Sequence, residues 1–203
     1  MTHFDEEAKK WDDIPVRAER ARAVAEAIRE QLPLTPSTSA LEYGCGTGLL
    51  SFALQPYLGS ITLADSSTGM LEVLRDKIAA SGAKNMQPVR LDLASDPLPA
   101  EKYDLIYLLM TLHHIPDTAT LLRKFHALLH PGGHLCIADL DKEDGSFHDY
   151  EFVGHLGFER KALEKTLQQA GFAEIRYTTP FAMQKNGRTY PLFLAIAERP
   201  AHA

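Results

Sequence analysis

Short, largely apolar runs alternate with amphipathic segments along most of the 203 residues of the chain. The runs contain no Gly or Pro, and their length and apolar character are typical of strands buried in a parallel sheet. They cover Ala40–Tyr43, Ile61–Ala64, Val89–Leu93, Leu105–Met110 and His134–Leu140. Helical periodicity fills the intervals, so that strand and helix alternate five times. This order predicts a doubly wound α/β fold with right-handed crossovers and helices on both faces of the sheet.

Capping residues bound the expected helices. One helix begins at Pro15, because proline fits the first helical position. Others begin after Ser66 or Ser67 and after Asp117, whose side chains suit an N-cap. Their apolar stripes are Val24, Ile28 and Leu32; Leu71, Leu74 and Ile78; Leu121, Leu122, Phe125, Leu128 and Leu129; and Leu163 and Leu167. Pro131-Gly132-Gly133 is expected to end the third of these helices and Gly171 the fourth.

The C-terminal part of the chain has a different pattern. Ala173–Thr179 and Pro191–Glu198 are strand-like, and the segment between them contains Asn186-Gly187, which favours a tight turn. No helix fits between the two runs, so they are expected to pair antiparallel. The sheet then has about seven strands, mostly parallel, with the last strand antiparallel.

Composition excludes several classes of protein. The net charge is -6 and basic residues are scattered among acids, which argues against a nucleic-acid partner. The two cysteines, Cys45 and Cys136, predict neither a disulfide framework nor a zinc site. The acidic N-terminal residues are not expected to act as a signal peptide, and the sequence contains no run of about 20 apolar residues. We therefore expect a cytoplasmic protein without membrane insertion, and the oligomeric state stays open.

The segment from Glu42 to Gly48 is the most informative for chemistry. Its glycines permit a tight turn where a strand meets a helix, the place where α/β proteins bind nucleotide-like ligands. The spacing is G-x-G-x-G, with Leu49 where a dinucleotide fingerprint has its final Gly. Glu42 would repel a pyrophosphate but could hold a cation. S-adenosylmethionine carries an ammonium and a sulfonium and no phosphate, so the segment favours it over a dinucleotide.

This segment resembles the first motif of the class I S-adenosylmethionine-dependent methyltransferases, which are Rossmann-like. Four later segments resemble the family in the same order, and the closest similarity is to its small-molecule branch (methyltransferase type 11), which includes ubiquinone and menaquinone biosynthesis enzymes. The four segments are Ile61–Met70, Leu91–Leu93, Tyr103–Asp117 and Leu129–Leu135. The resemblance implies an enzyme that transfers a methyl group from S-adenosylmethionine.

The resemblance also implies a set of cofactor-binding residues. Asp65 would bond the ribose hydroxyls, Asp92 and the adjacent backbone amide would meet the adenine, and Met70 would lie near the adenine edge. The implied set is Glu42, Gly44, Cys45, Gly46, Asp65, Ser66, Met70, Asp92, Leu93 and Met110. Simpler interpretations stay open, because Asp65 could be a helix cap, Asp92 a loop acid and Met70 a core residue.

Histidines supply the candidates for acid–base catalysis. His113 and His114 follow the fourth strand, and we expect a structural role for His113 and a possible catalytic role for His114. His148 and His155 lie in a polar, aromatic-rich loop from Asp141 to Gly157, which we expect to form the acceptor pocket and to contribute a base or a substrate contact. An exposed loop with solvated histidines is the alternative. Their spacing with Asp141 matches no metal-ligand pattern, so no metal is expected.

The N-terminal segment carries Phe4 and Trp11, the only tryptophan. The resemblance suggests a flap over cofactor and substrate with Trp11 facing inward; a helix packed on the domain is the alternative. The expected organisation is a single domain over residues 1–203. It comprises an N-terminal helical flap (1–33), a cofactor-binding core (34–141), a substrate loop (142–158) and a C-terminal helix with a strand pair (159–203).

The acceptor is expected to be a small organic molecule. Enzymes that methylate amide or ring-amino nitrogens share a similar motif after the fourth strand. It consists of an acidic or Asn residue followed by Pro-Pro and an aromatic residue. Here that place reads Leu109-Met110-Thr111-Leu112, which favours an oxygen, carbon or sulfur nucleophile. Two other functions stay open: an NAD-dependent oxidoreductase, and a non-catalytic partner subunit that binds S-adenosylmethionine.

Overall fold

The computed structural model describes residues 3–148, 150 and 152–201. The chain divides into two compact units, residues 1–97 and 98–203, called here the N-terminal and the C-terminal unit and described separately. No helix in the described residues is long and apolar enough to cross a membrane.

The N-terminal unit contains three parallel strands in the order β3-β2-β1. They are β1 (Ser39–Tyr43), β2 (Ser60–Asp65) and β3 (Met86–Arg90). In register, Ala40 lies opposite Ile61, which itself lies opposite Met86. All three side chains are buried. β1 and β2 contribute several buried residues to this unit's core, as the sequence predicted, whereas β3 is buried only at Met86, which precedes the predicted run.

Two helices of the N-terminal unit, α2 and α4, begin where the capping pattern predicted. The helices described in this unit are α1 (His3–Glu7), η1 (Ala8–Asp13), α2 (Pro15–Gln31), α3 (Leu49–Leu54), η2 (Gln55–Tyr57) and α4 (Thr68–Ser81). Pro15 opens α2, and the Ser67 hydroxyl caps α4 by accepting a hydrogen bond from the amide of Met70. The expected stripe residues Val24 and Ile28 are fully buried.

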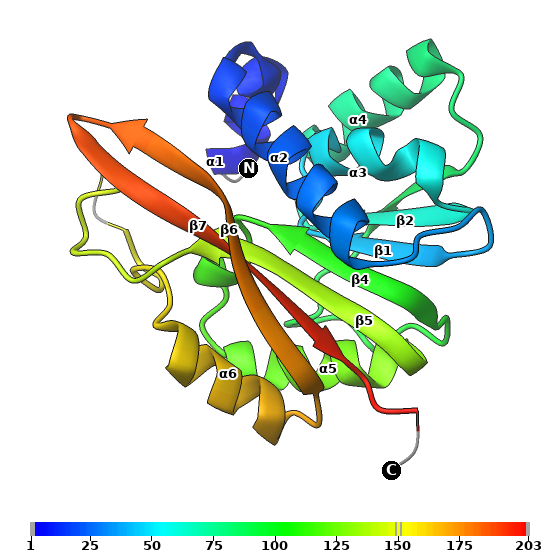
Figure 1. The fold of residues 1–203 in the computed structure, drawn as a ribbon. Coiled ribbons are helices and arrows are strands. Elements are labelled where there is room, and N and C mark those ends of the chain that lie inside the picture. The colour runs from blue at the N-terminus through cyan, green and yellow to red at the C-terminus, as the bar shows by residue number, and fades with distance from the viewer. Residues whose placement is uncertain (1–2, 149, 151, 202–203) are drawn as a thin grey trace. The chain divides into compact units, whose positions relative to one another are not determined.

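The C-terminal unit contains four strands in the order β4-β5-β7-β6 (Figure 1). They are β4 (Tyr103–Leu109), β5 (Leu129–Leu140), β6 (Ala173–Lys185) and β7 (Arg188–Glu198). β4 and β5 run parallel, whereas β7 is antiparallel to both β5 and β6. The turn at Asn186-Gly187 has positive φ angles of 52° and 73°, which Asn and Gly tolerate. The described residues of the two units thus hold seven strands, and the last strand is antiparallel, as predicted.

Three helices accompany these strands: η3 (Leu112–His114), α5 (Thr118–Leu128) and α6 (Arg160–Gln169). The Asp117 carboxylate caps α5 by accepting the amide of Thr120, and Gly171 follows α6 with a φ of 99°, as the sequence predicted. α5 and α6 lie side by side against one face of this unit's strands (Figure 1).

Two expectations about element boundaries were wrong. β3 ends at Arg90, and no helix lies in the described connection 91–102, although the alternation predicted one. Two prolines, Pro97 and Pro99, and a turn capped by Asp92 oppose helix there. β5 begins at Leu129, so Pro131–Gly133 form an irregularity within that strand, where its pairing with β4 changes register.

Candidate functional site

The glycine turn of the N-terminal unit connects β1 to α3. The amides of Gly44 and Cys45 both donate to the carbonyl of Ala64, at 2.8 and 3.0 Å, which fixes the turn against β2. Gly48 precedes α3 with a φ of +80°, and a Cβ there would lie 2.7 Å from Leu74 Cδ1. Only glycine satisfies both the conformation and the close packing. The helix then starts at Leu49, which explains the short G-x-G-x-G spacing.

Asp65 lies at the carboxyl end of β2 and binds the glycine turn. Its carboxylate accepts the amides of Gly46 at 2.7 Å and Ser67 at 2.8 Å. Burial raises the pKa of Asp65, although these hydrogen bonds oppose the shift. A carboxylate has about four acceptor positions, so capacity for ligand hydroxyls is left after both amides are bound. Ser66, another predicted cofactor-binding residue, directly follows Asp65 in the chain and is exposed.

Glu42 lies on β1 beneath the turn, with only 3% of its surface exposed. The Ser51 hydroxyl donates to Glu42 Oε2. Burial raises the pKa of Glu42 to about 8, because an ionised carboxylate is poorly solvated there. The group is therefore largely protonated at neutral pH, and a cation placed beside it would restore its charge.

The predicted adenine-binding segment follows β3. The Asp92 carboxylate accepts the Ala94 amide at 2.9 Å and the Ser95 hydroxyl at 3.2 Å, so it caps a turn. The Leu93 amide, expected to face a ligand, donates to the Tyr43 hydroxyl at 3.1 Å. Burial raises the pKa of Tyr43 to about 12, so this hydroxyl stays protonated. Sequence reasoning gave Tyr43 no role here, since this contact joins residues far apart in the chain.

The N-terminal segment lies against the glycine turn. A Cβ on Gly46 would lie 3.8 Å from Trp11 Nε1 and 3.9 Å from the buried Met70 Sδ. The Arg17 guanidinium stacks 3.6 Å from the Trp11 ring centre and donates to the Trp11 carbonyl. Trp11 is thus beside the candidate cofactor residues.

Two carboxylates attach this segment to the rest of the unit. Asp12 accepts the Thr47 hydroxyl at 2.6 Å and pairs with Lys77 at 2.6 Å. Asp5 accepts the Ser67 hydroxyl at 2.6 Å, adding a long-range contact at the start of α4. The sequence contains both acids, but the pattern did not indicate either partner.

A buried pair of a histidine and a carboxylate lies at the carboxyl ends of β4 and β5 in the C-terminal unit. His113 Nδ1 lies 2.7 Å from Asp139 Oδ1, and the side chains are 2% and 0% exposed. Asp139 also accepts the backbone amides of His113 at 3.1 Å and Leu140 at 2.8 Å. Because a carboxylate only accepts, Nδ1 carries the hydrogen and Nε2 is the basic atom of the neutral ring. Sequence reasoning missed this partner; an acid at the end of an otherwise apolar strand was the available signal.

His114 and His148 surround this pair. The ring centres of His114 and His148 lie 4.1 and 5.6 Å from that of His113. Burial, with smaller contributions from neighbouring histidines, lowers the pKa of His114 to about 4. Burial also lowers the pKa of His148, which stacks on Phe152 at 3.7 Å and whose Nδ1 has no hydrogen-bond partner in the described residues. The structure therefore brings three of the four predicted histidines together.

The ring of His155 makes its contacts outside this cluster, although its backbone bonds to His113. Its Nε2 lies 3.0 Å from the Ile115 carbonyl, and its amide donates to the His113 carbonyl at 2.8 Å.

Asp141 forms a two-point ion pair with Arg160, at 2.7 and 2.6 Å. No group of three or more His, Cys, Asp or Glu side chains in the described residues is arranged to hold a metal ion.

Two further features belong to the C-terminal unit. Met110 directly follows β4 with a φ of 54°, and its amide donates to the Ala138 carbonyl at 2.8 Å. An open depression of about 370 Å³ lies between the start of the predicted substrate loop and β7. Its lining consists of residues 141–144, Ser146 and residues 188–191. Part of the predicted acceptor loop therefore borders a hollow surface.

Comparisons with known proteins agree with this fold. A family model described as a methyltransferase domain matches residues 16–177. A ubiquinone biosynthesis O-methyltransferase from Marinobacter nauticus is 34% identical over 53% of this chain and 46% of that protein. The Vibrio parahaemolyticus ubiquinone/menaquinone biosynthesis C-methyltransferase is 27% identical over 70% of this chain and 67% of its own length. The chain spans about half the length of the first of these relatives.

A solved structure gives the same result for the fold. A SAM-dependent methyltransferase from Aquifex aeolicus superposes with a TM-score of 0.71 at 20% identity, over 96% of this chain and 98% of that one. The similarity covers both units, and the predicted Rossmann-like fold is confirmed.

Proposed function

Because this chain belongs to the methyltransferase domain family, we propose that it transfers a methyl group from S-adenosylmethionine to a small organic acceptor. The acceptor atom is an oxygen, sulfur or carbon that bears a removable proton. The observation that carries this proposal is the buried pair of Asp139 and His113, 2.7 Å apart, at the strand ends where α/β enzymes place their chemistry.

The N-terminal unit holds the cofactor in this proposal. Glu42 fits a cationic ligand, since a neighbouring ammonium or sulfonium offsets the burial that raises its pKa to about 8. Asp65 bonds the ribose hydroxyls with acceptor positions that Gly46 and Ser67 leave open. Trp11 lies beside Gly46 and covers the turn. When bound, S-adenosylmethionine supplies a methyl group on a good leaving group.

His113 acts as the base. Its Nδ1–H is held by Asp139, so Nε2 takes the proton of the acceptor and the carboxylate stabilises the resulting imidazolium. His114, with a pKa near 4, stays neutral and adds no competing positive charge. We therefore assign to His113 the role that the sequence left with His114, His148 or His155.

His148 and Phe152 complete the acceptor side. Their stacked rings both lie 5.6 Å from the His113 ring, between centroids, and present an aromatic surface beside the base. Such a surface suits a planar organic acceptor. The named relatives that methylate ubiquinone precursors at oxygen or carbon support an acceptor of this kind.

The test is product formation. The chain is incubated with S-adenosylmethionine and a panel of phenols, alcohols, thiols and carbon acids, and methylated products are identified by mass spectrometry. His113→Ala should lower turnover about 10²- to 10⁴-fold, the usual contribution of a general base. Cofactor affinity should not change, because His113 belongs to the acceptor side.

The matched control is His130→Ala, which removes an exposed imidazole near the start of β5. Asp139→Asn should lower turnover as well, since an amide holds the ring but cannot stabilise the imidazolium. Full turnover in both His113→Ala and Asp139→Asn would refute the assignment of the base.

A further inference from the structure

The hairpin of β6 and β7 extends beyond the strand that it joins. β7 pairs with β5 from Leu192 to Glu198, whereas its first residues pair only with β6. Figure 1 shows this part of the hairpin projecting past the end of β5. The projecting part carries Arg188 and Tyr190, whose side chains contact the loop that follows β5.

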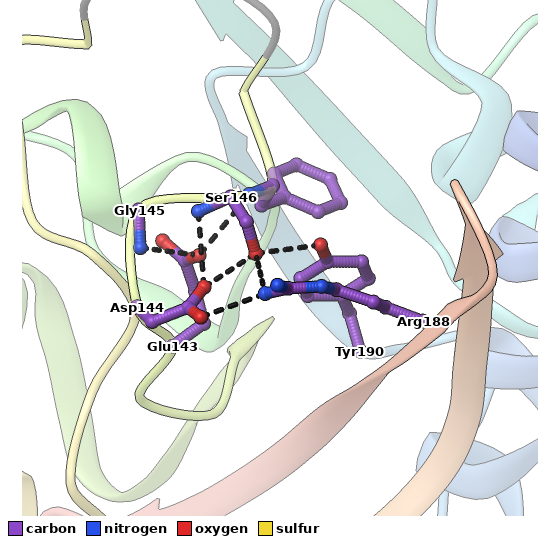
Figure 2. Close-up of polar contacts among 7 residues, drawn as sticks. Glu143, Asp144, Gly145, Ser146, Arg188 and Tyr190 are labelled. Atoms are coloured by element: carbon purple, nitrogen blue, oxygen red, sulfur yellow. Dashed lines mark hydrogen bonds and ion pairs between the residues drawn. The ribbon is translucent and has the colours of Figure 1, made fainter.

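Polar contacts join the hairpin to this loop (Figure 2). Arg188 Nη1 donates to Asp144 Oδ2 at 2.7 Å and to Ser146 Oγ at 2.8 Å. The Ser146 hydroxyl lies 2.8 Å from the Tyr190 hydroxyl and also donates to Asp144. We call these four residues the clasp. Its ion pair is exposed, so its contribution depends on the network and not on one contact.

Aromatic packing extends the clasp toward the histidines. Tyr190 is only 5% exposed, and its ring centre lies 5.2 Å from that of Phe147. Lys185 donates to the Phe147 carbonyl and lies 5.2 Å from its ring. His148 is the next residue, and its ring meets that of Phe147 edge-on at 5.0 Å.

The backbone between the clasp and His148 is also fixed locally. Glu143 Oε2 accepts the amides of Gly145 at 2.8 Å and Phe147 at 3.1 Å, which closes the loop on itself. A displacement of the clasp would therefore move the loop as a piece and carry His148 with it. His148 would then leave its place 5.6 Å from the His113 ring.

We propose that Arg188 and Tyr190 are positioning residues that hold His148 beside His113 through the clasp. In the described part of the chain, neither side chain hydrogen-bonds to or stacks on a histidine; both act through Asp144, Ser146 and Phe147. The role rests on the proposed function, because it concerns the acceptor side of the same reaction. In that reaction His148 orients the acceptor, and a misplaced orienting group lowers the rate at constant cofactor affinity.

Two variants test the role. Arg188→Met removes the ion pair and keeps the length of the side chain, and Tyr190→Phe removes only the hydroxyl. Arg188→Lys restores the charge opposite Asp144 and should recover part of the loss. Thr189→Val is the matched control, because the Thr189 hydroxyl bonds Gln184 across the hairpin and not the loop.

The first readout is the rate at which diethyl pyrocarbonate modifies His148, followed by peptide mass spectrometry. Both clasp variants should raise this rate about threefold or more, the order expected for the net loss of a hydrogen bond. His130 in the same samples should react at the wild-type rate, and Thr189→Val should behave as wild type. An unchanged rate at His148 in both variants overturns the proposal.

The second readout is the kinetics with the acceptor that the panel yields. The double variant should lose about tenfold in kcat/KM, with the dissociation constant for S-adenosylmethionine unchanged. A faster modification of His148 with unchanged kcat/KM overturns the link to the reaction. Failure of the proposed function looks different, because wild type would then form no methylated product while the modification rates at His148 still differ.

Discussion

Replacing Glu42 by Gln should change how the stability of the protein depends on pH. Glu42 is 3% exposed and its carboxyl accepts the Ser51 hydroxyl. Gln keeps the size and an acceptor oxygen but cannot ionise. The substitution therefore isolates the cost of placing a negative charge at this position.

The magnitude follows from the pKa of Glu42, which burial raises from 4.5 to about 8. A folded-state pKa above the unfolded value means that the folded protein binds this proton more tightly. The associated stability is fully present below pH 4.5 and is lost as the pH rises through about 8. Between these limits the free energy of unfolding falls by about 1.4 kcal/mol per pH unit, to a total of about 5 kcal/mol at most.

The assay is urea unfolding of wild type and Glu42→Gln at several pH values between 5 and 9. The variant should gain stability relative to wild type as the pH rises, with most of the change complete by about pH 8. Glu72→Gln, at an exposed position on α4, is the control and should show no such trend. A difference between wild type and Glu42→Gln that stays constant with pH would refute the reasoning.

Two further predictions concern the flap and the loop histidines. Trp11 lies beside Gly46 and Met70, so its fluorescence should change when S-adenosylmethionine binds. Identical emission at saturating ligand would contradict the prediction that Trp11 covers the glycine turn. His148→Ala should lower turnover at unchanged cofactor affinity, whereas His155→Ala, whose Nε2 lies against the Ile115 carbonyl, should mainly lower thermal stability. Equal kinetic defects in the two variants would contradict this division.

Locally determined features could be predicted from the sequence. Ser67, Asp117 and the Asn186-Gly187 turn all act through neighbours a few residues away, and the structure has them in the predicted roles. The glycine spacing could be recognised in the sequence, although the turn is also held by two residues about 20 positions away, Ala64 and Asp65. β3 was placed too late because Leu91 and Leu93 look like strand residues, whereas the turn at Asp92 and the following prolines end the strand.

Contacts between distant residues could not be predicted in the same way. His113 and Asp139 belong to different elements, and only the parallel pairing of β4 and β5 brings their ends together. The hydrogen bond from Leu93 to Tyr43 and the clasp at Arg188 depend on tertiary structure too. The periodicity of a single sequence does not indicate which of several acids a histidine will contact. The sequence therefore identified candidate site residues, whereas only the tertiary structure showed which residues they contact.

Calorimetric titration with S-adenosylmethionine and with NAD tests the central claim most directly. The glycine turn, with Glu42 beneath it and Asp65 bound to Gly46, should bind S-adenosylmethionine and give no heat with NAD. Asp65→Ala should weaken the binding by about 1–3 kcal/mol, the cost of losing hydrogen bonds to a charged group. Binding of NAD without binding of S-adenosylmethionine, or unchanged affinity in Asp65→Ala, would contradict the claim that this turn is the S-adenosylmethionine site.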